Sequence, residues 1–328
     1  METLKRIKNC LLAYLGRLEI TSVTLALTTA CNLKCRMCDI WERNGECSDE
    51  LSSDAVTRVL KHPSLEKTRH ITFTGGEPFL RKDLSSLYSH ARSLFPKSTL
   101  LISSNGTLTG EIGDFLTGIK IDRRLVLELS IHGLQSHDRL TRTPGALRQT
   151  QHSIALIQQK FPWAGLQAKF VITPWNYDDI ERAAAYFRQK RMRFVFKIVE
   201  NNKSYTNALH FEENSKNGTF VFSPEQKRAI RQALRSVRRN PLGNGLVTQR
   251  LIRYLETGRV DGRCFVPARS LFVNADGEAY RCRNFPPAGD VHKDDLDAGS
   301  FPGTGFRRQG RCDEKICASC VSLLRLLD

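Results

Sequence analysis

Between residues 20 and 200, short apolar runs alternate with longer segments whose apolar residues recur every three to four positions. The short runs predict strands, and the periodic segments predict helices. Strands and helices that alternate in this way indicate the crossover units of a parallel sheet. Six such units are too few for a closed eight-stranded barrel, so we expect an α/β fold built as a partial (β/α)6 barrel. The predicted strands are Val23–Leu27, Ile71–Phe73, Thr99–Ser103, Leu125–Ile131, Gln167–Thr173 and Arg193–Val199, and the predicted helices are Asp54–Leu60, Leu84–Phe95, Ile112–Thr117, Leu147–Lys160 and Ile180–Lys190.

Three of the predicted strands carry a charged residue on the face opposite to their large apolar residues. These residues are Glu128, Lys169 and Lys197. In a barrel, the apolar face packs on the helices and the other face lines the interior. Polar groups in such an interior either hold a substrate or form a structural salt-bridge network, and the sequence leaves both open. We name the three residues as candidate catalytic residues.

The pattern changes on both sides of this segment. Residues 4–18 predict a short amphipathic helix that either caps the next domain or lies on a membrane surface. After a polar loop, Ser223 is suited to cap a helix, with Pro224 in the first turn and Gln226 completing a capping box. Beyond residue 262 the chain is rich in Gly, Pro and Cys. We therefore divide the chain into an N-terminal helix (1–19), an α/β core (20–200), a basic helical linker (201–261) and a small cysteine-rich domain (262–328).

The composition is that of a basic globular protein. The chain has 328 residues, 40% of them hydrophobic, and 50 Lys and Arg against 34 Asp and Glu give a net charge of +16. Residues 188–253 hold 15 Lys and Arg against 4 Asp and Glu, and so contribute +11 of that charge. Such a segment suits an anionic partner, namely a phosphorylated or nucleotide-linked sugar, an acidic peptide or RNA. Arginines that only face water are the alternative, and without an interleaved aromatic platform we expect no nucleic-acid partner.

The chain shows no membrane or secretory segment. No apolar run reaches the roughly 18 residues that a membrane span requires. The N-terminus has a basic start but neither an uninterrupted apolar stretch nor a cleavage site of small residues. We expect a cytoplasmic protein without a membrane span. In that reducing compartment, cysteines serve in metal binding or catalysis more often than in disulfides.

The ten cysteines form two main groups, and the first of them follows the first predicted strand. Cys31, Cys35 and Cys38 lie on one short loop. Three thiolates on such a loop can hold three corners of a four-iron, four-sulfur cluster and leave the fourth iron open to a bound molecule. A structural zinc site with Cys47 as its fourth ligand is the alternative.

This CxxxCxxC loop and the motifs after it resemble the radical S-adenosylmethionine (SAM) superfamily over about residues 20–200. A TGGEP motif (74–78) ends the second strand, SSNG (103–106) ends the third, and Ser130 ends the fourth, followed by IHG where the family frequently has IDG. The resemblance implies that the open iron binds the amino and carboxylate groups of SAM. It implies that an electron, from a donor of the flavodoxin or ferredoxin type, cleaves SAM to methionine and a 5′-deoxyadenosyl radical that abstracts a hydrogen atom from the substrate.

The resemblance also implies which residues lie at the cofactor. The two glycines let the backbone approach a ligand, so that their carbonyl groups and Glu77 receive the ammonium of SAM. A guanidinium suits the carboxylate, although Arg142 is alternatively a surface residue. The residue before the third cysteine contacts the adenine side. The expected cofactor-binding residues are Met37, Gly75, Gly76, Glu77, Ser103, Asn105, Ser130 and Arg142.

The second cysteine group resembles the SPASM extension of that superfamily, or its shortened form, Twitch. Short strands are expected around Ser270–Val273 and Glu278–Arg281, the second of which ends in the GEAYRC stretch (277–282). Full SPASM domains carry seven cysteines for two auxiliary clusters, whereas this segment has five, which implies one auxiliary [4Fe-4S] cluster. A zinc ribbon is the alternative. The expected ligands are Cys264, Cys282, Cys317 and Cys320, with Cys312 as an alternative ligand.

Two cysteines stand outside these sets. Cys10 is expected to be a small buried residue of the first helix. Cys47 lies shortly after the first cysteine loop, where a thiol either returns a hydrogen atom to a substrate radical or only packs. We add Cys47 to the candidate catalytic residues.

Relatives with SPASM or Twitch extensions modify ribosomally made peptides and proteins, or they dehydrogenate or epimerise carbohydrates. Only about 20 residues precede the first strand, so we expect no leader-binding domain. In having a single expected auxiliary cluster, the chain is similar to the carbohydrate dehydrogenases. We therefore expect a radical SAM oxidoreductase that acts on a carbohydrate or nucleotide-sugar substrate, with the auxiliary cluster as electron acceptor. A peptide-modifying enzyme is the alternative, and a zinc-containing nucleic-acid-binding protein is a remote one.

Overall fold

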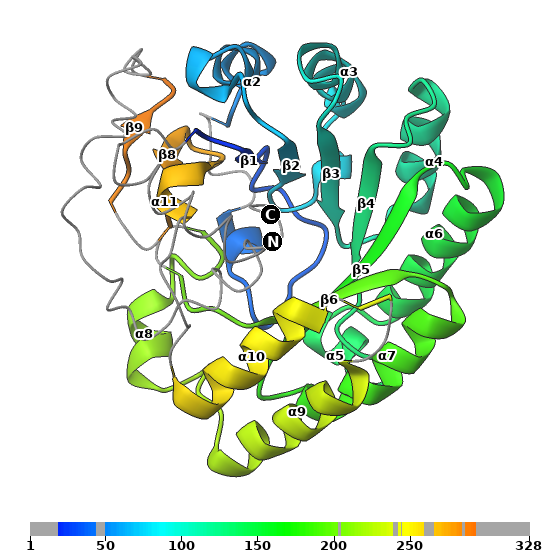
Figure 1. Cartoon of the computed structure of the whole chain (residues 1–328), viewed down its shortest axis with the longest axis vertical. Helices are drawn as coiled ribbons and strands as arrows, with labels where there is room; N and C mark the ends of the chain where they lie inside the picture. The colour runs from blue at the N-terminus through cyan, green and yellow to red at the C-terminus, as the bar shows by residue number, and fades with distance from the viewer. Residues whose placement is uncertain are drawn as a thin grey trace, which may run out of the picture.

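The chain forms a curved sheet whose outer face is covered by helices (Figure 1). The computed structural model describes residues 19–43, 50–202, 205–238, 242–243, 245–258, 266–283 and 286–292. The predicted N-terminal helix lies outside these residues, as do Cys10, Cys47, Cys264, Cys312, Cys317 and Cys320.

Strands and helices alternate along the core as the hydrophobic pattern predicts. All six predicted strands and all five predicted helices are present, with small shifts of their ends. The strands are β1 (Ser22–Ala26), β2 (His70–Thr74), β3 (Thr99–Ser104), β4 (Leu125–Ser130), β5 (Gly165–Ile172), β6 (Arg193–Ile198), β7 (Ser270–Val273), β8 (Glu278–Tyr280) and β9 (Gly289–Asp290). The helices are α2 (Ser53–Leu60), α3 (Leu84–Leu94), α4 (Thr109–Gly118), α5 (His137–Thr141), α6 (Ala146–Lys160), α7 (Ile180–Gln189), α8 (Phe211–Lys216), α9 (Pro224–Val237), α10 (Gly245–Thr257) and α11 (Val266–Arg269). Short 3-10 turns are η1 (Ile40–Arg43), η2 (Pro63–Leu65), η3 (Pro78–Leu80) and η4 (Tyr177–Asp179).

The described strands belong to one sheet in the order β6-β5-β4-β3-β2-β1-β7-β8-β9. Strands β1 to β6 pair in parallel, which confirms the α/β fold with an open, partial barrel. The two strands expected near residues 270 and 280 are also present. The sequence did not predict that β7 pairs in parallel with β1, where Ser22 lies opposite Ser270. The described part of the cysteine-rich segment therefore extends the sheet of the core, and the division into domains stays a prediction.

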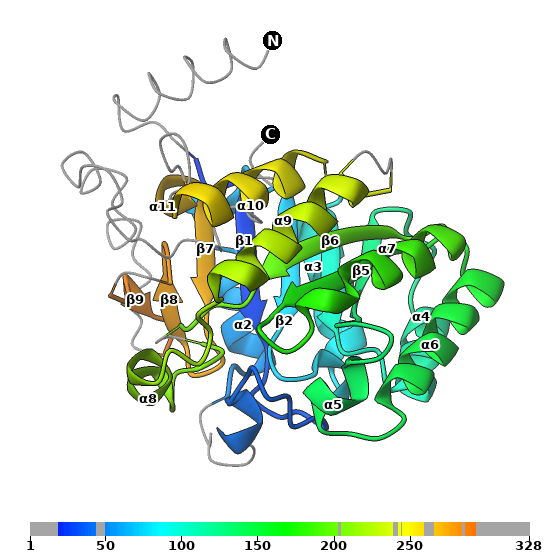
Figure 2. The same ribbon diagram turned by 90° about the horizontal axis from the view of Figure 1, so that it is seen from below.

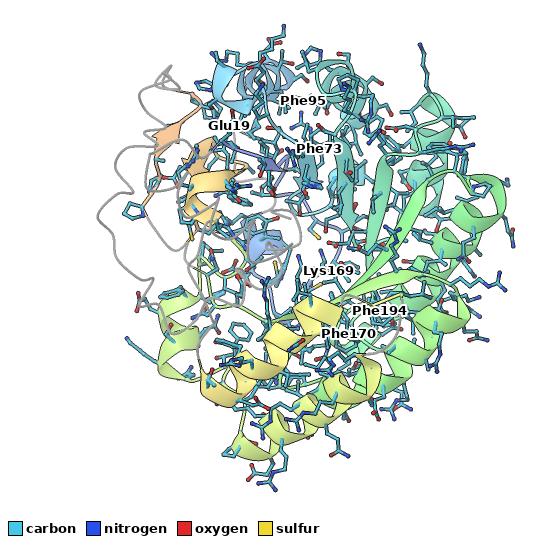
Figure 3. All side chains as sticks on the ribbon, viewed as in Figure 1. Glu19, Phe73, Phe95, Lys169, Phe170 and Phe194 are labelled. Atoms are coloured by element: carbon cyan, nitrogen blue, oxygen red, sulfur yellow. The ribbon has the colours of Figure 1, made fainter. Side chains whose placement is uncertain are left out.

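The two faces of the sheet differ as the alternation predicts. Leu125, Leu127 and Leu129 of β4 are fully buried in the main hydrophobic cluster. On the neighbouring strands, the aromatic rings of Phe170 and Phe194 both pack edge to face on a third ring of the same cluster. Figure 3 shows Lys169 on the inner side of β5, away from these rings. The apolar face thus holds the helices in place and leaves the inner face free for polar groups.

The segment after β6 departs in part from the expectation. The stretch between residues 200 and 223 was expected to be a loop, which is wrong at α8, a short helix within it. The cap at Ser223 is confirmed, because its side chain accepts from Gln226 and a reciprocal bond completes the capping box. Helices α9 and α10 lie side by side beyond β6 (Figures 1 and 2), where Phe194 donates its amide to Leu242. Along the described part of the chain, no helix is both long enough and apolar enough to cross a bilayer.

Candidate active site

The cysteine loop leaves the carboxyl end of β1. Figure 2 shows this blue segment, α5 and α8 gathered at one end of the sheet. Because the strands of the core are parallel, the segments after each of them meet at this end, where α/β proteins build their sites. The loop is thus placed beside the ends of β2, β3 and β4, which carry the other motifs.

Three free thiols lie close together on this loop. Burial raises the pKa of Cys31 to about 11 and that of Cys38 to about 12, and it raises the pKa of Cys35 as well. The negative charge of a neighbouring cysteine adds to this effect for Cys35 and for Cys38, so the three sulfur atoms act on one another. Such thiols become thiolates when a cation balances their charge, and thiolates are the soft ligands that iron–sulfur clusters require.

A zinc ion and a four-iron cluster require different spacings of the cysteine thiols. Among the described residues, no three His, Cys, Asp or Glu side chains are placed to hold one metal ion. A zinc ion binds sulfur at about 2.3 Å and so requires its cysteine sulfur atoms within about 4 Å of one another. In a four-iron cluster each cysteine binds a different iron, so the sulfur atoms lie farther apart.

Two glycines at the end of β2 let this strand lie against the first turn of the cysteine loop. A Cβ atom at Gly75, where φ is +137°, would lie 2.4 Å from the carbonyl oxygen of Thr28, and one at Gly76 would lie 2.1 Å from that of Ala30. The amides of Gly76 and Glu77 each donate a hydrogen bond of 2.7 Å to those same two oxygens. The close approach that glycine permits is therefore made to the chain itself, and it holds the cysteine loop in place.

Glu77 joins the ends of β2 and β3. Its carboxylate is fully buried and accepts hydrogen bonds from the amide of Phe79 (3.1 Å), the hydroxyl of Ser104 (2.9 Å) and the amide of Asn105 (2.7 Å). Burial raises the pKa of Glu77 to about 7. The side chain of Asn105 in turn donates to Asn32 (2.8 Å) and hydrogen-bonds Cys31. Glu77 and Asn105 thus connect β3 to the cysteine loop.

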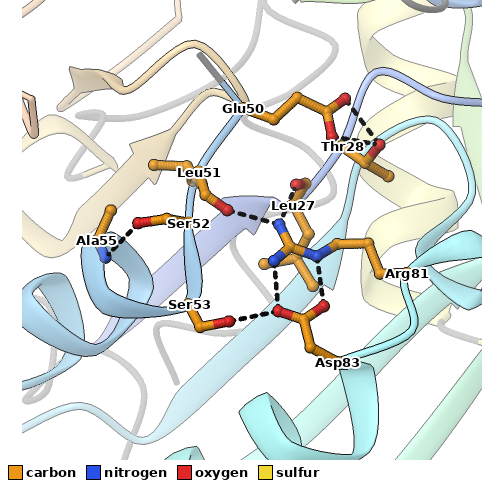
Figure 4. A network of polar contacts seen from close by, with 9 residues as sticks. All are labelled: Leu27, Thr28, Glu50, Leu51, Ser52, Ser53, Ala55, Arg81 and Asp83. Atoms are coloured by element: carbon orange, nitrogen blue, oxygen red, sulfur yellow. Dashed lines mark hydrogen bonds and ion pairs between the residues drawn. The ribbon is translucent and has the colours of Figure 1, made fainter. Parts of the chain in front are cut away.

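A second polar network holds the start of the loop (Figure 4). Glu50 accepts hydrogen bonds from the Thr28 hydroxyl (2.8 Å) and the Thr29 amide (2.7 Å). Arg81 donates to the carbonyl oxygens of Leu27 (2.8 Å) and Leu51 (2.6 Å) and pairs with Asp83. Hydrogen bonds from Arg81 lower the pKa of Asp83 to about 2. Glu50 and Arg81 were not expected from the sequence, since neither lies in a motif and Thr28, Leu27 and Leu51 are distant from them along the chain.

Tyr205, also missed, brings the segment after β6 to the same place. Its hydroxyl donates to the carbonyl oxygen of Gly75 (2.9 Å), and its own carbonyl accepts from Arg43 (2.7 Å). Its ring packs at 5.0 Å from that of Phe272 on β7, in a small apolar cluster that Cys38 contacts. Burial raises the pKa of Tyr205 to about 12, so the hydroxyl stays a hydrogen-bond donor at neutral pH.

The three charged residues of the barrel interior are brought together as the strand pattern predicts. The ammonium group of Lys169 lies 2.5 Å from the hydroxyl of Ser103 and 3.4 Å from the carboxylate of Glu128. Gln167 donates to the same carboxylate (2.7 Å). Burial acts to raise the pKa of Glu128, but Lys197 and Lys169 outweigh it and the pKa is lowered. Glu128 therefore carries its negative charge among two lysines, and its catalytic role stays a prediction.

The remaining candidate residues differ in their surroundings. Arg142 ends α5 in a left-handed conformation (φ 53°), is exposed, and has a positive charge that lowers the pKa of Cys35. Ser130 lies opposite Lys169 in the sheet, whereas Met37 packs into the hydrophobic core. Cys282, the described member of the expected auxiliary set, is a buried free thiol two residues after β8.

The sequence of the α/β core matches a known protein family. Residues 25–195 match the radical SAM superfamily. The chain belongs to the radical SAM superfamily. Its members are enzymes that use a [4Fe-4S] cluster and SAM, which confirms the enzyme class and these two cofactors, and the thiols of the cysteine loop fit the cluster.

Curated relatives of this radical SAM protein match part of its length. It is 31% identical to a probable GTP 3′,8-cyclase of Methanocella arvoryzae over 193 residues, which are 56% of this chain and 57% of that protein. It is 32% identical to a probable GTP 3′,8-cyclase of Methanococcus maripaludis over 105 residues (32% of this chain and 35% of that protein). It is 29% identical to an AdoMet-dependent heme synthase of Oleidesulfovibrio alaskensis over 178 residues (53% and 41%). The chain thus spans between about a third and just over half of the length of these relatives.

Solved structures share the fold over most of the chain. Streptococcus suis SuiB has a TM-score of 0.63 at 15% identity and covers 99% of this chain and 79% of its own. The complex of anSMEcpe with AdoMet and the Kp18Cys peptide has a TM-score of 0.59 at 14% identity and covers 86% and 80%. At this identity the likeness shows the fold alone.

Proposed function

We propose that this protein is a radical SAM oxidoreductase that abstracts a hydrogen atom from a substrate held in the barrel interior. One observation carries the proposal. Gly75 and Gly76 hold the three-cysteine loop at the carboxyl end of the parallel strands, and the strands with the charged inner residues run toward that same end. When bound, the cluster and SAM supply the electron and the 5′-deoxyadenosyl group for the abstraction. Cys31, Cys35 and Cys38 hold the cluster.

Other residues orient SAM in this proposal. The exposed guanidinium of Arg142, whose side chain has no partner among the described residues, is available to the SAM carboxylate. The backbone of Gly75 and Gly76 remains the expected contact of the ammonium group. The Glu77 carboxylate already accepts three hydrogen bonds from the chain, so we assign it to holding Asn105 and the cysteine loop.

For the substrate we propose a peptide. SuiB has been solved with its precursor peptide SuiA, and anSMEcpe with the Kp18Cys peptide; both share this fold over most of the chain. The carbohydrate or nucleotide-sugar substrate expected from the sequence is the second candidate. It is favoured by the relatives named for a GTP cyclase, whose named substrate carries phosphate and ribose.

The auxiliary cluster and the electron donor complete the proposal. Cys264, Cys282, Cys317 and Cys320, with Cys312 as an alternative, would hold a second [4Fe-4S] cluster, which would supply an acceptor for the electron left on the substrate. A flavodoxin or ferredoxin supplies the first electron in the cytoplasm, and Cys47 is the candidate hydrogen-atom donor. The burial of Cys282 just after β8 supports a site for this cluster near the end of that strand.

Anaerobic reconstitution of the full chain tests the proposal. We expect about eight irons per chain and formation of 5′-deoxyadenosine with SAM and dithionite. The triple variant Cys31→Ala, Cys35→Ala, Cys38→Ala should keep about four irons and form no 5′-deoxyadenosine, whereas Cys10→Ala should behave as the wild type. Bound zinc without 5′-deoxyadenosine would overturn the proposal. Deuterium transfer into 5′-deoxyadenosine from a labelled acidic peptide or a labelled nucleotide sugar separates the two substrate classes.

A further inference from the structure

The barrel interior holds two lysine ammonium groups around one carboxylate. Lys169 is satisfied within the protein, because it contacts both Ser103 and Glu128. Lys197 lies on the same inner face, opposite Val171 in the neighbouring strand. Among the residues that the structure describes, no hydrogen-bond or ion-pair partner is found for the Lys197 side chain, although it is only partly exposed. Lys197 is therefore an interior cation that makes no direct hydrogen bond or ion pair with a described residue.

The charges near Lys197 act on it without a direct ion pair. The charged groups that act on it are Glu128, Lys169, Glu200 and Arg283. Glu128 pairs with Lys169, and Glu200 lies 3.4 Å from Arg283, which joins the residues just beyond β6 and β8. Glu128 is thus shared by Lys169 and Lys197, and Lys197 makes no direct ion pair with a described residue. A partly buried ammonium group without a direct ion pair is costly, and a bound anion lowers that cost.

Lys197 also lies near the carboxyl end of its strand. It is the residue before the last one of β6, nearer to the carboxyl end of its strand than Lys169 is on β5. The cysteine loop starts at the carboxyl end of β1, and the carboxyl ends of these parallel strands lie on one side of the sheet. A group bound by Lys197 is therefore on the side of the barrel from which the cysteine loop approaches.

We propose that Lys197 binds a carboxylate or phosphate group of the substrate and so fixes the substrate in the barrel. The inference rests on the proposed function and deepens it by naming the substrate chemistry. A carboxylate would come from an acidic side chain of a peptide, and a phosphate would come from a phosphorylated sugar. Both groups offer several acceptor oxygens to the three donors of an ammonium group.

Binding of inorganic phosphate to the reconstituted full chain tests this site by equilibrium dialysis. Lys197→Met removes the charge and keeps most of the stem, Lys197→Arg keeps the charge, and Lys160→Met makes the same change on an exposed residue of α6. We expect phosphate binding to weaken about tenfold or more, roughly 1.4 kcal/mol, in Lys197→Met. It should stay within about threefold of the wild type in Lys197→Arg and be unchanged in Lys160→Met. Binding in Lys197→Met as tight as in the wild type, or no binding in the wild type, would overturn the inference.

Competition identifies the source of the anion, and SAM cleavage separates the two proposals. Stronger displacement of phosphate by glucose 1-phosphate supports a phosphorylated sugar, and stronger displacement by an acetylated glutamate peptide supports an acidic peptide. Displacement by neither would overturn the assignment to substrate. Formation of 5′-deoxyadenosine by the wild type from SAM and dithionite, without substrate, tests the proposed function independently of phosphate binding. If phosphate binding depends on Lys197 but the wild type forms no 5′-deoxyadenosine, the anion site stands and the proposed function is refuted.

Discussion

Gly76→Ala addresses the contact that holds the cysteine loop. The added Cβ atom would lie 2.1 Å from the carbonyl oxygen and 2.6 Å from the carbonyl carbon of Ala30, and 2.7 Å from the carbonyl oxygen of Thr29. These are backbone atoms, which cannot turn aside as the end of a flexible side chain can. The end of β2 and the cysteine loop must therefore move apart.

The magnitude follows from the contacts that the movement strains. Overpacking costs about 1 to 3 kcal/mol. The two hydrogen bonds of 2.7 Å between this segment and the loop contribute about 1 kcal/mol each. Gly76→Ala should thus destabilise the loop by about 3 to 5 kcal/mol, enough to displace the three thiols from their common site.

The assay compares iron content, urea unfolding and SAM binding of the reconstituted protein. Gly110→Ala is the matched control, because a Cβ atom there meets nothing within 4 Å and Gly110 lies in α4. We expect the control to keep its iron and to gain up to about 1 kcal/mol of stability. Gly76→Ala with full iron content and with stability within about 0.5 kcal/mol of the wild type would refute this account of the glycines.

Three further variants test the neighbouring contacts. Tyr205→Phe removes the hydrogen bond to the Gly75 carbonyl, and we expect it to lower the free energy of unfolding by about 1 kcal/mol and to weaken SAM binding measured by calorimetry. Tyr177→Phe is the control and should leave both quantities unchanged. Equal SAM affinity in the two variants would contradict this role of Tyr205. Glu50→Gln weakens the hold on Thr28 and Thr29 and should cost about 1.5 to 3 kcal/mol in urea unfolding, whereas the exposed Glu66→Gln should cost nothing measurable. Burial raises the pKa of Glu77 in the folded state to about 7, above its ordinary 4.5, so its contribution to stability is complete below pH 4.5 and is lost as the pH rises through 7. Unfolding followed from pH 4.5 to 8 should show a decline of roughly 3 kcal/mol that Glu77→Gln lacks, and an equal decline in that variant would show that other groups cause it.

Local and periodic features of the fold could be predicted from the sequence. The strands of the core follow from short apolar runs, and the start of α9 follows from the capping box at Ser223. The strand period of two also placed Glu128, Lys169 and Lys197 on one face, and the structure brings them into one interior network. Each of these inferences needs only residues close together in the sequence.

The features that were missed depend on contacts between distant parts of the chain. The pairing of β7 with β1 joins residues about 250 positions apart, and no pattern within either strand specifies its partner. Tyr205 reaches Gly75 across 130 positions, and Arg81 reaches Leu27 across 54. The glycines were expected to let the backbone approach a ligand, which stays a prediction, and only the fold shows that they also lie against the backbone of Thr28 and Ala30.

The most direct test of the account is electron paramagnetic resonance of the anaerobically reduced full chain, recorded with and without SAM. We predict the signal of a reduced [4Fe-4S] cluster that changes when SAM binds its open iron. The Cys31→Ala, Cys35→Ala, Cys38→Ala variant should lack the SAM-dependent change. A wild-type signal that SAM leaves unchanged, or one that the triple variant shows equally, would contradict the assignment of these three cysteines.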